Sequence, residues 1–415
     1  MIKKIRVFFG FSGLVLVLVL SSSRPALAAT LVVDDDRVEC RRAKFTTIQR
    51  AVNRARPGDT IRVCPGTYDE QIRITKRQLR IIGPFDNSAV VSPSVMQANT
   101  TNKVTGIPIA AAVLVSGTTN VTIRRLTIDG VNNGIAACEP TLIGIFYRNA
   151  SGTIRDVDIT NMRLGSGLEG CQSGLGIFVQ KLGKPVREVR VLTSTVHDYQ
   201  KNGITGTEGG TRLQVDHNTV TGIGPTSGAA QNGIQIGFRA TGKIARNVVS
   251  NHIWSPCVSV SVSDCEFVAT GLAIANTKNV SIRGNTVGRS QCGICLGPPK
   301  PPEGEGDQVN DSQVIGNTVF DTGVFDGIAL TGNNNRVISN TITNSGRSGI
   351  FLNGDDNRIR RNNINGAPIC VLETTGSEGN VITENGCVNT ATSLQDTAGK
   401  AEDSPVGGGK PDLFR

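Results

Sequence analysis

Aromatic side chains are scarce in this sequence. They make up 4% of the 415 residues, with 3 Tyr and 1 Trp, whereas Gly occurs 49 times. A broad globular core usually contains many large rings, so this composition favours a narrow core filled by Val and Ile. Basic clusters interleaved with aromatic residues are also absent, and we therefore expect no nucleic-acid partner.

Long hydrophobic runs are absent after the first segment of the chain. Residues 1–29 have the features of a secretory signal, because a basic start precedes the apolar run Val7–Leu20 and a small-residue cleavage pattern, Ala26-Leu27-Ala28. The run is short for a membrane span, and no second run follows it. We expect a secreted or periplasmic protein with no membrane span after cleavage. The signal holds four basic residues and no acid, so cleavage lowers the net charge from +9 to +5.

What the sequence does contain is a repeat between Leu213 and Cys387. An apolar residue, two variable residues, Asn, one variable residue and a second apolar residue recur every 22 to 38 residues, a spacing typical of solenoids. A second phrase, Gly followed by Ile or Leu, alternates with the first. The Asn residues are Asn218, Asn247, Asn285, Asn317, Asn340, Asn362 and Asn385; the Gly residues are Gly203, Gly233, Gly271, Gly293, Gly327 and Gly349.

Each phrase predicts a short β-strand, because its apolar residues alternate with period two and it is too short for a helix. Turns of two or three such strands would stack at about 4.8 Å into a parallel β-helix. The Asn residues would then form a ladder at one inward corner, which Leu126, Val157 and Ser194 continue upstream. The alternative is that Asn only marks exposed turns. We expect Asn and Gly at the corners because both tolerate left-handed backbone.

These phrases resemble the pectin-lyase-like family of right-handed parallel β-helix proteins, in particular the group called carbohydrate-binding and sugar-hydrolysis domains. The resemblance covers roughly Thr30 to Val388 and implies an all-β fold, a single-stranded right-handed parallel β-helix. We divide the chain into a signal peptide (1–29), a β-helix with an N-terminal cap (30–390) and a polar tail expected to be disordered (391–415). The predicted cap is an amphipathic helix over 45–55, with Thr46 and Gln49 at capping-box spacing.

Ten Cys residues in an exported chain predict disulfides. Local order suggests the pairs Cys40–Cys64, Cys138–Cys171 and Cys370–Cys387. Cys292 and Cys295 would lie about 10 Å apart in an extended strand, which is beyond disulfide reach. We therefore expect them to pair with Cys257 and Cys265 on a neighbouring rung, in either order.

In the enzymes that this chain resembles, the ligand lies along an outer sheet, which corresponds here to the Gly-Ile strands. Strand alternation turns the residue after Ile outward. The predicted substrate-binding residues are Phe146, Phe178, Gln180 and Gln235. Phe146 and Phe178 on neighbouring rungs would form an exposed aromatic step suited to sugar faces. The alternative is that long loops cover both rings.

A group of ionisable residues supplies the catalytic candidates, which are His197, Asp198, Tyr199, Lys201 and Arg148. Lyases and epimerases of uronic acids need a base for the proton beside the carboxylate, and a cation for the resulting anion. His197 or Tyr199 would act as base or acid. Lys201 or Arg148 would neutralise the anion, and Asp198 would orient His197 or bind a cation. The alternative is that all are solvated loop residues.

The expected partner is a polysaccharide, and the basic charge favours an acidic one. We weigh lyase or epimerase chemistry on uronic-acid polymers against a non-catalytic carbohydrate-binding or surface structural role, and we expect a monomer. No metal ligands are assigned, and calcium is the one cofactor considered. One branch of the resembled family serves copper maturation, but copper sites need His, Met or free Cys. Only 3 His and 3 Met are present, and the Cys residues are expected in disulfides.

Overall fold

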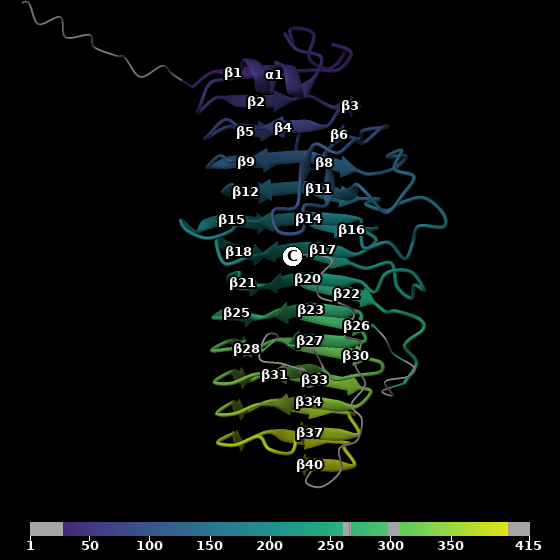
Figure 1. Ribbon diagram of the computed structural model, residues 1–415, viewed down its shortest axis with the longest axis vertical. Helices are drawn as coiled ribbons and strands as arrows, with labels where there is room; N and C mark the ends of the chain where they lie inside the picture. The colour runs from purple at the N-terminus through teal and green to yellow at the C-terminus, as the bar shows by residue number, and fades with distance from the viewer. Residues whose placement is uncertain (1–27, 260–264, 266, 298–307, 397–415) are drawn as a thin grey trace, which may run out of the picture.

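Alternating apolar residues wind the chain into a right-handed coil of short parallel strands. The computed structural model describes residues 28–259, 265, 267–297 and 308–396. Residues 1–27 of the expected signal and residues 397–415 of the expected tail lie outside the described residues. Three long sheets run the length of the coil, with their inward Val, Ile and Leu residues forming one continuous core (Figure 1). The all-β parallel β-helix is therefore confirmed.

Sheet A, the first of the three, carries the apolar residue that precedes each corner Asn. Inward residues such as Ile81, Val215 and Ile359 are fully buried, and their neighbours on the strand point to solvent. Its strands are β1 (Thr30–Val33), β2 (Thr60–Val63), β5 (Arg80–Ile82), β9 (Val121–Arg124), β12 (Gly152–Arg155), β15 (Arg187–Leu192), β18 (Thr211–Asp216), β21 (Thr241–Ala245), β25 (Val280–Arg283), β29 (Gln313–Ile315), β32 (Arg336–Ile338), β35 (Arg358–Arg360) and β38 (Val381–Thr383).

Sheet B begins immediately after the corner. Its inward positions are also apolar, as at Val220 and Ile342. Its strands are β3 (Gly66–Tyr68), β6 (Ala89–Val91), β10 (Thr127–Asp129), β13 (Asp158–Thr160), β16 (Thr195–His197), β19 (Thr219–Thr221), β22 (Val248–His252), β26 (Thr286–Ser290), β30 (Thr318–Thr322), β33 (Thr341–Ser345), β36 (Asn363–Asn365) and β39 (Gly386–Val388).

Sheet C contains the Gly-Ile phrases. Gly293 is required by close packing, since a Cβ there would lie 2.4 Å from a methyl of Val319 and 2.6 Å from the carbonyl oxygen of Gly327. The strands are β4 (Ile72–Ile74), β8 (Pro108–Ser116), β11 (Thr141–Arg148), β14 (Leu175–Gln180), β17 (Asn202–Thr207), β20 (Asn232–Gly237), β23 (Thr270–Ala275), β27 (Cys292–Leu296), β31 (Ile328–Thr331), β34 (Ser348–Asn353), β37 (Ile369–Glu373) and β40 (Thr392–Asp396). The short strand β7 (Thr100–Thr101) pairs antiparallel with β8, and β24 (Thr277–Lys278) pairs with β28 (Val309–Asn310).

The corner between sheets A and B contains the predicted Asn ladder. Nδ2 of Asn218 donates to Oδ1 of Asn247 at 2.9 Å, and equivalent bonds continue to Asn385. The Asn residues from Asn218 to Asn362 are buried, so the alternative of exposed turns is wrong. Left-handed backbone occurs one residue earlier than expected, for example at His217 (φ 57°).

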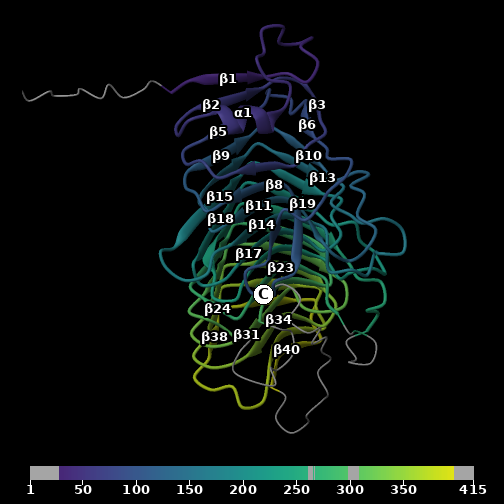
Figure 2. The same ribbon diagram turned by 45° about the horizontal axis from the view of Figure 1, so that its top comes forward.

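Helix α1 (Ile48–Arg54) lies over the N-terminal end of the coil, as the cap prediction requires (Figure 2). Its apolar face, including Ile48 and Val52, is buried against the first rungs. The N-cap is Thr47, whose hydroxyl accepts from the Arg50 amide, so the assignment to Thr46 was wrong by one residue. At the other end, β40 extends the coil past residue 390 to Asp396.

Five disulfides link the ten cysteines. The three pairs suggested by local order are confirmed: Cys40–Cys64, Cys138–Cys171 and Cys370–Cys387. The expected cross-rung pairs are wrong, because Cys257 pairs with Cys265 and Cys292 with Cys295. The Cα atoms of Cys292 and Cys295 are 6.3 Å apart. In the register with β23, Cys292 pairs with Thr270 and Ile294 with Leu272, and Gly293 is skipped. The strand bends at this glycine, so both cysteines face outward and lie in the same outer apolar cluster.

Candidate functional site

The outer face of sheet C is covered where the aromatic step was expected. Phe146 is completely buried and Phe178 is 1% exposed, and their rings stack with centroids 4.9 Å apart. They pack in an apolar cluster with residues such as Ile109 and Leu114 of β8. The prediction of an exposed sugar-stacking step is therefore wrong, and the alternative of covered rings is confirmed.

The cover includes residues 99–107, which cross in front of β11 and β14 (Figure 1). Gln180 is buried and holds this segment at two points: Oε1 accepts from the amide of Lys103 at 2.9 Å, and Nε2 donates to Oδ1 of Asn102 at 3.1 Å. Arg148 adds a bond from Nε to the Thr101 carbonyl oxygen at 3.0 Å. Two predicted site residues thus anchor the covering segment.

Gln235 lies further along the same face, on β20, and is only partly buried. Its Oε1 accepts from Nδ2 of Asn202 at 2.9 Å and from Nδ2 of Asn232 at 3.3 Å. It is therefore the predicted substrate-binding residue that keeps some contact with solvent.

The predicted catalytic residues do not converge. Tyr199 is fully buried in the core, where its hydroxyl is hydrogen-bonded to Nε2 of His252. Lys201 donates from Nζ to the Ala230 carbonyl oxygen at 2.7 Å, and burial lowers the pKa of Lys201 to about 8. Arg148 lies on sheet C and His197 on sheet B, so the two point from different faces.

His197 lies between two carboxylates on the outer face of sheet B. Its Nδ1 is 2.6 Å from Oδ2 of Asp198, and its Nε2 is 3.2 Å from Oδ1 of Asp158. All three side chains are about one third or more exposed. The group therefore offers a solvent-accessible imidazole with carboxylates at both nitrogens, and Asp158 was not among the predicted residues.

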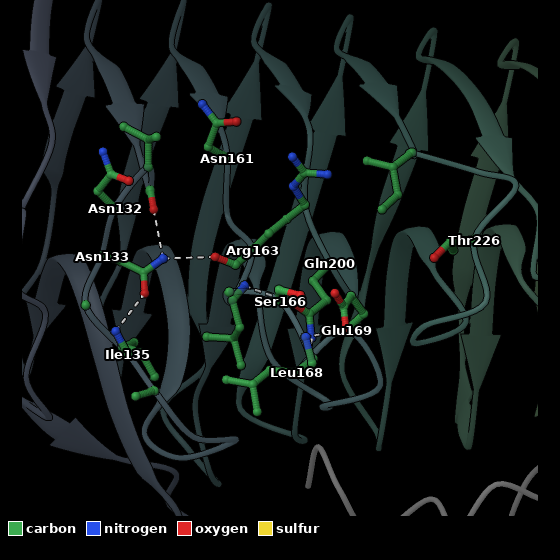
Figure 3. A pocket seen from close by; sticks show the side chains of 18 residues that line it. Asn132, Asn133, Ile135, Asn161, Arg163, Ser166, Leu168, Glu169, Gln200 and Thr226 are labelled. Atoms are coloured by element: carbon green, nitrogen blue, oxygen red, sulfur yellow. Dashed lines mark hydrogen bonds between the residues drawn. The ribbon is translucent and has the colours of Figure 1, made fainter.

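A cleft of about 830 Å³ opens beside these strands, between the loops that leave sheet B (Figure 3). We call it the loop cleft; it is lined mainly by residues 130–136 and 161–169, with Gln200, Ile223 and Thr226. Asn133 donates to the carbonyl oxygens of Gly130 and Arg163, and Cys138–Cys171 joins the two loops. The exposed side chains of Arg163 and Glu169 remain available to a ligand.

The outer face of sheet A carries a row of cations. Lateral neighbours on adjacent strands form one line of outward side chains, which we call the cationic row. Every member is basic or polar, and none is acidic. In order they are Arg80, Thr122, Thr153, Arg190, Gln214, Lys243, Ser281, Gln313, Arg336 and Arg358.

The five basic members of the cationic row are exposed, and the described residues place none of them in a salt bridge. A second row beside it adds further basic residues, of which Arg124 and Arg155 pair with Asp156 and Arg360 with Glu384. A hollow of about 640 Å³ lies on the cationic row between Arg80 and Arg190, with Glu188 at its edge. Sheet A therefore presents a basic face with hydrogen-bonding side chains between the charges.

The sequence pattern of one family, described as "Protein of unknown function (DUF1565)", matches residues 34–263. This chain belongs to that family. A second pattern, "Periplasmic copper-binding protein (NosD)", matches residues 254–403. No curated relative matches the sequence.

Solved structures share the fold at low sequence identity. The mannuronan C-5 epimerase AlgE4 A-module of Azotobacter vinelandii has a TM-score of 0.53 at 14% identity, covering 84% of this chain and 90% of that one. PfbA, a surface adhesin of Streptococcus pneumoniae, has a TM-score of 0.58 at 14% identity, covering 85% and 88%. The Dettilon tailspike protein has a TM-score of 0.55 at 18% identity, covering 83% and 64%. These similarities establish the parallel β-helix.

The side chains of this member do not suit copper in the segment that resembles NosD. Residues 254–403 contain neither His nor Met, and their six cysteines all form disulfides. Copper sites in proteins use imidazole, thioether or thiolate ligands. The residues present therefore do not fit the metal in that family's description.

Two structural features bear on location. Five disulfides are typical of proteins in an oxidising compartment, such as the periplasm or the extracellular space. Among the residues that the structure describes, no helix combines the length and apolar character needed to cross a membrane.

Proposed function

We propose that this is an exported β-helix protein that binds an acidic polysaccharide, such as a uronic-acid polymer, along the cationic row. The observation that carries the proposal is the unbroken lateral register of basic and polar side chains from Arg80 to Arg358. Carboxylates of a polymer would pair with guanidinium and ammonium groups, while sugar hydroxyls would bond to the Thr, Ser and Gln side chains between them.

The spacing of the row suits a linear polymer. Adjacent strands are about 4.8 Å apart, so the row extends over roughly 40 Å and each rung advances by a distance comparable to one sugar unit. The basic members are exposed and unpaired among the described residues, so binding costs no buried ion pair. A non-catalytic role is supported by the separation of His197, Tyr199 and Arg148 over different faces.

The proposal is tested by the affinity of the purified protein for oligomeric alginate and pectate, measured calorimetrically at low and moderate salt. Exchanging Arg190→Glu and Lys243→Glu together should weaken binding at least ten-fold, because two attractions become repulsions. Binding should also weaken as salt rises, because exposed charges are screened. The matched control is Arg163→Glu in the loop cleft, which should leave affinity unchanged. The proposal is contradicted if Arg163→Glu loses binding while the double variant keeps it. It is also contradicted if the parent protein binds a neutral polysaccharide as tightly as alginate or pectate.

A second candidate is uronate lyase or epimerase activity at His197. The observation that favours it is the accessible imidazole between Asp158 and Asp198, beside the loop cleft. For His197 to accept the proton adjacent to the substrate carboxylate, one of its ring nitrogens would have to give up its contact with Asp158 or Asp198. Arg163 would be the exposed cation of the cleft lining. Ultraviolet absorbance of unsaturated ends, lost with His197→Gln, would establish the lyase. Silence on alginate, pectate and glycosaminoglycans, with and without calcium, would exclude it.

A further inference from the structure

Four acidic residues gather in the loop that follows β1, at the capped end of the coil. We call Asp34, Asp35, Asp36 and Glu39 the cap cluster; one carboxylate oxygen from each lies within 4.8 Å of the others. The loop is the purple segment that continues from β1 at the top of Figure 2. The disulfide Cys40–Cys64 ties its end to sheet A. This surface is separate from the cationic row and from the loop cleft.

Each Asp of the cap cluster uses one oxygen to organise the backbone. Oδ2 of Asp34 accepts from the Cys40 amide at 2.6 Å, and Oδ2 of Asp35 accepts from the Thr67 amide at 2.9 Å. Oδ1 of Asp36 accepts from the Val38 amide at 2.8 Å. These bonds hold the carboxylates in place and leave each with a second oxygen.

The second oxygens of Asp34 and Asp35 are the decisive observation. Asp34 is completely buried, and Oδ1 of both residues lacks a hydrogen-bond partner within the described chain. None of the salt bridges among the described residues involves the cap cluster. Burying a carboxylate beside other carboxylates is costly unless a cation compensates the charge. The side chains that the structure describes supply no cation paired with these carboxylates.

We infer that the cap cluster binds a calcium ion. Calcium takes oxygen ligands at 2.3–2.6 Å, so four carboxylate oxygens that all lie within 4.8 Å of one another are close enough to share one ion. An all-carboxylate set favours a hard cation over copper or zinc. Magnesium prefers a tighter octahedron and retains several waters, which suits this crowded set less well.

The ion would have a structural role. It would join the loop after β1 to β3 through Asp35 and Thr67, and to the Cys40–Cys64 link through Asp34. The open end of a solenoid must be closed by a cap. Calcium would therefore stabilise the terminal rung, independently of whether the protein binds a polysaccharide.

The test uses the full secreted chain, freed of metal with a chelator and titrated with calcium chloride in the absence of polysaccharide. We expect one calcium per chain and an increase in the thermal unfolding midpoint, with magnesium binding at least ten-fold more weakly. The double variant Asp36→Asn/Glu39→Gln changes only exposed ligands and should fold. It should bind calcium at least ten-fold more weakly and lose the midpoint increase.

The matched control is Asp86→Asn, an exposed acid on another loop, which should bind calcium as the parent does. Absence of calcium binding at millimolar concentration would overturn the inference. Unchanged calcium affinity in the double variant would also overturn it, because the ion would then lie elsewhere. Magnesium binding as tight as calcium binding would contradict the assignment to calcium.

Discussion

At the scale of single residues, His252 is a titratable side chain that the coil buries in its core. It lies in the core at the end of β22, with its Nδ1 lacking a partner among the described residues. Burial lowers the pKa of His252 to about 3, because the charged ring would lose its hydration. Among the described residues, the hydrogen bond of its ring joins Nε2 to the hydroxyl of Tyr199. The pair is therefore a neutral part of the core.

This pKa predicts an acid-sensitive fold. In the unfolded chain His252 has a pKa near 6.5. Below that pH the ring is protonated in the unfolded state but stays neutral in the folded state. The contribution of the neutral, buried His252 to the free energy of unfolding is complete above about pH 6.5. It is lost progressively as the pH falls towards 3. Urea unfolding at pH 7 and pH 5 should show a loss of roughly 2 kcal/mol from this residue.

The variant His252→Asn should show a smaller fall in unfolding free energy between those pH values. The control Tyr199→Phe keeps the imidazole buried, so the pH dependence should persist in it. An equal pH dependence in the parent and in His252→Asn would contradict the assignment.

Residue identity alone could not reveal which of these side chains reach solvent. Tyr199 and Lys201 were grouped with His197 because they adjoin it in sequence. The chain turns from sheet B into sheet C at that point, however, and carries Tyr199 inward. Because the backbone changes direction at this corner, His197 faces solvent while Tyr199, two residues later, is in the core.

At the scale of elements, the Asn ladder is the device that holds the corner between sheets A and B. Oδ1 of Asn340 accepts from the backbone amide of Asn317 at 2.9 Å, and its Nδ2 donates to the Val314 carbonyl oxygen at 2.9 Å. The same side chain bonds to Asn317 and Asn362. Each ladder residue thus satisfies buried polar groups of its neighbours.

Asn340→Ala should therefore destabilise the protein. Each buried group left without a partner costs roughly 1–3 kcal/mol, and this change affects several. The free energy of unfolding in urea is the measurement. The control is Asn363→Ala, an exposed Asn on β36, which should change stability by about 0.5 kcal/mol or less. Equal effects of the two substitutions would show that the ladder has no special role.

The repeat made the coil, its sheets and this ladder predictable, because strand period and corner chemistry recur in every rung. The insertions were not predictable in the same way. Nothing periodic in residues 99–107 indicates that they fold over Phe146 and Phe178. The bend at Gly293 likewise could not be inferred from an ideal extended strand, so the pairing of Cys292 with Cys295 was missed.

At the scale of the whole molecule, the stacking of rungs aligns equivalent residues of the repeat into continuous rows on the outer surface. In the first six Asn phrases the residue before the apolar position is polar or basic: Gln214, Lys243, Ser281, Gln313, Arg336 or Arg358. The seventh phrase has Val381 there, so the row ends at Arg358. The sequence therefore contains the signal for a polar row on the Asn-phrase strands, whereas the predicted substrate-binding residues lie on the Gly-Ile strands of sheet C. The register of the strands shows instead that the basic side chains align on sheet A.

The most direct measurement of the central claim is a crystal structure of the protein with a uronic-acid oligosaccharide. Our account predicts a sugar chain that crosses the strands of sheet A, with carboxylates at Arg190 and Lys243 and hydroxyls at Gln214 between them. An oligosaccharide bound in the loop cleft or on sheet C, with the cationic row free, would contradict it.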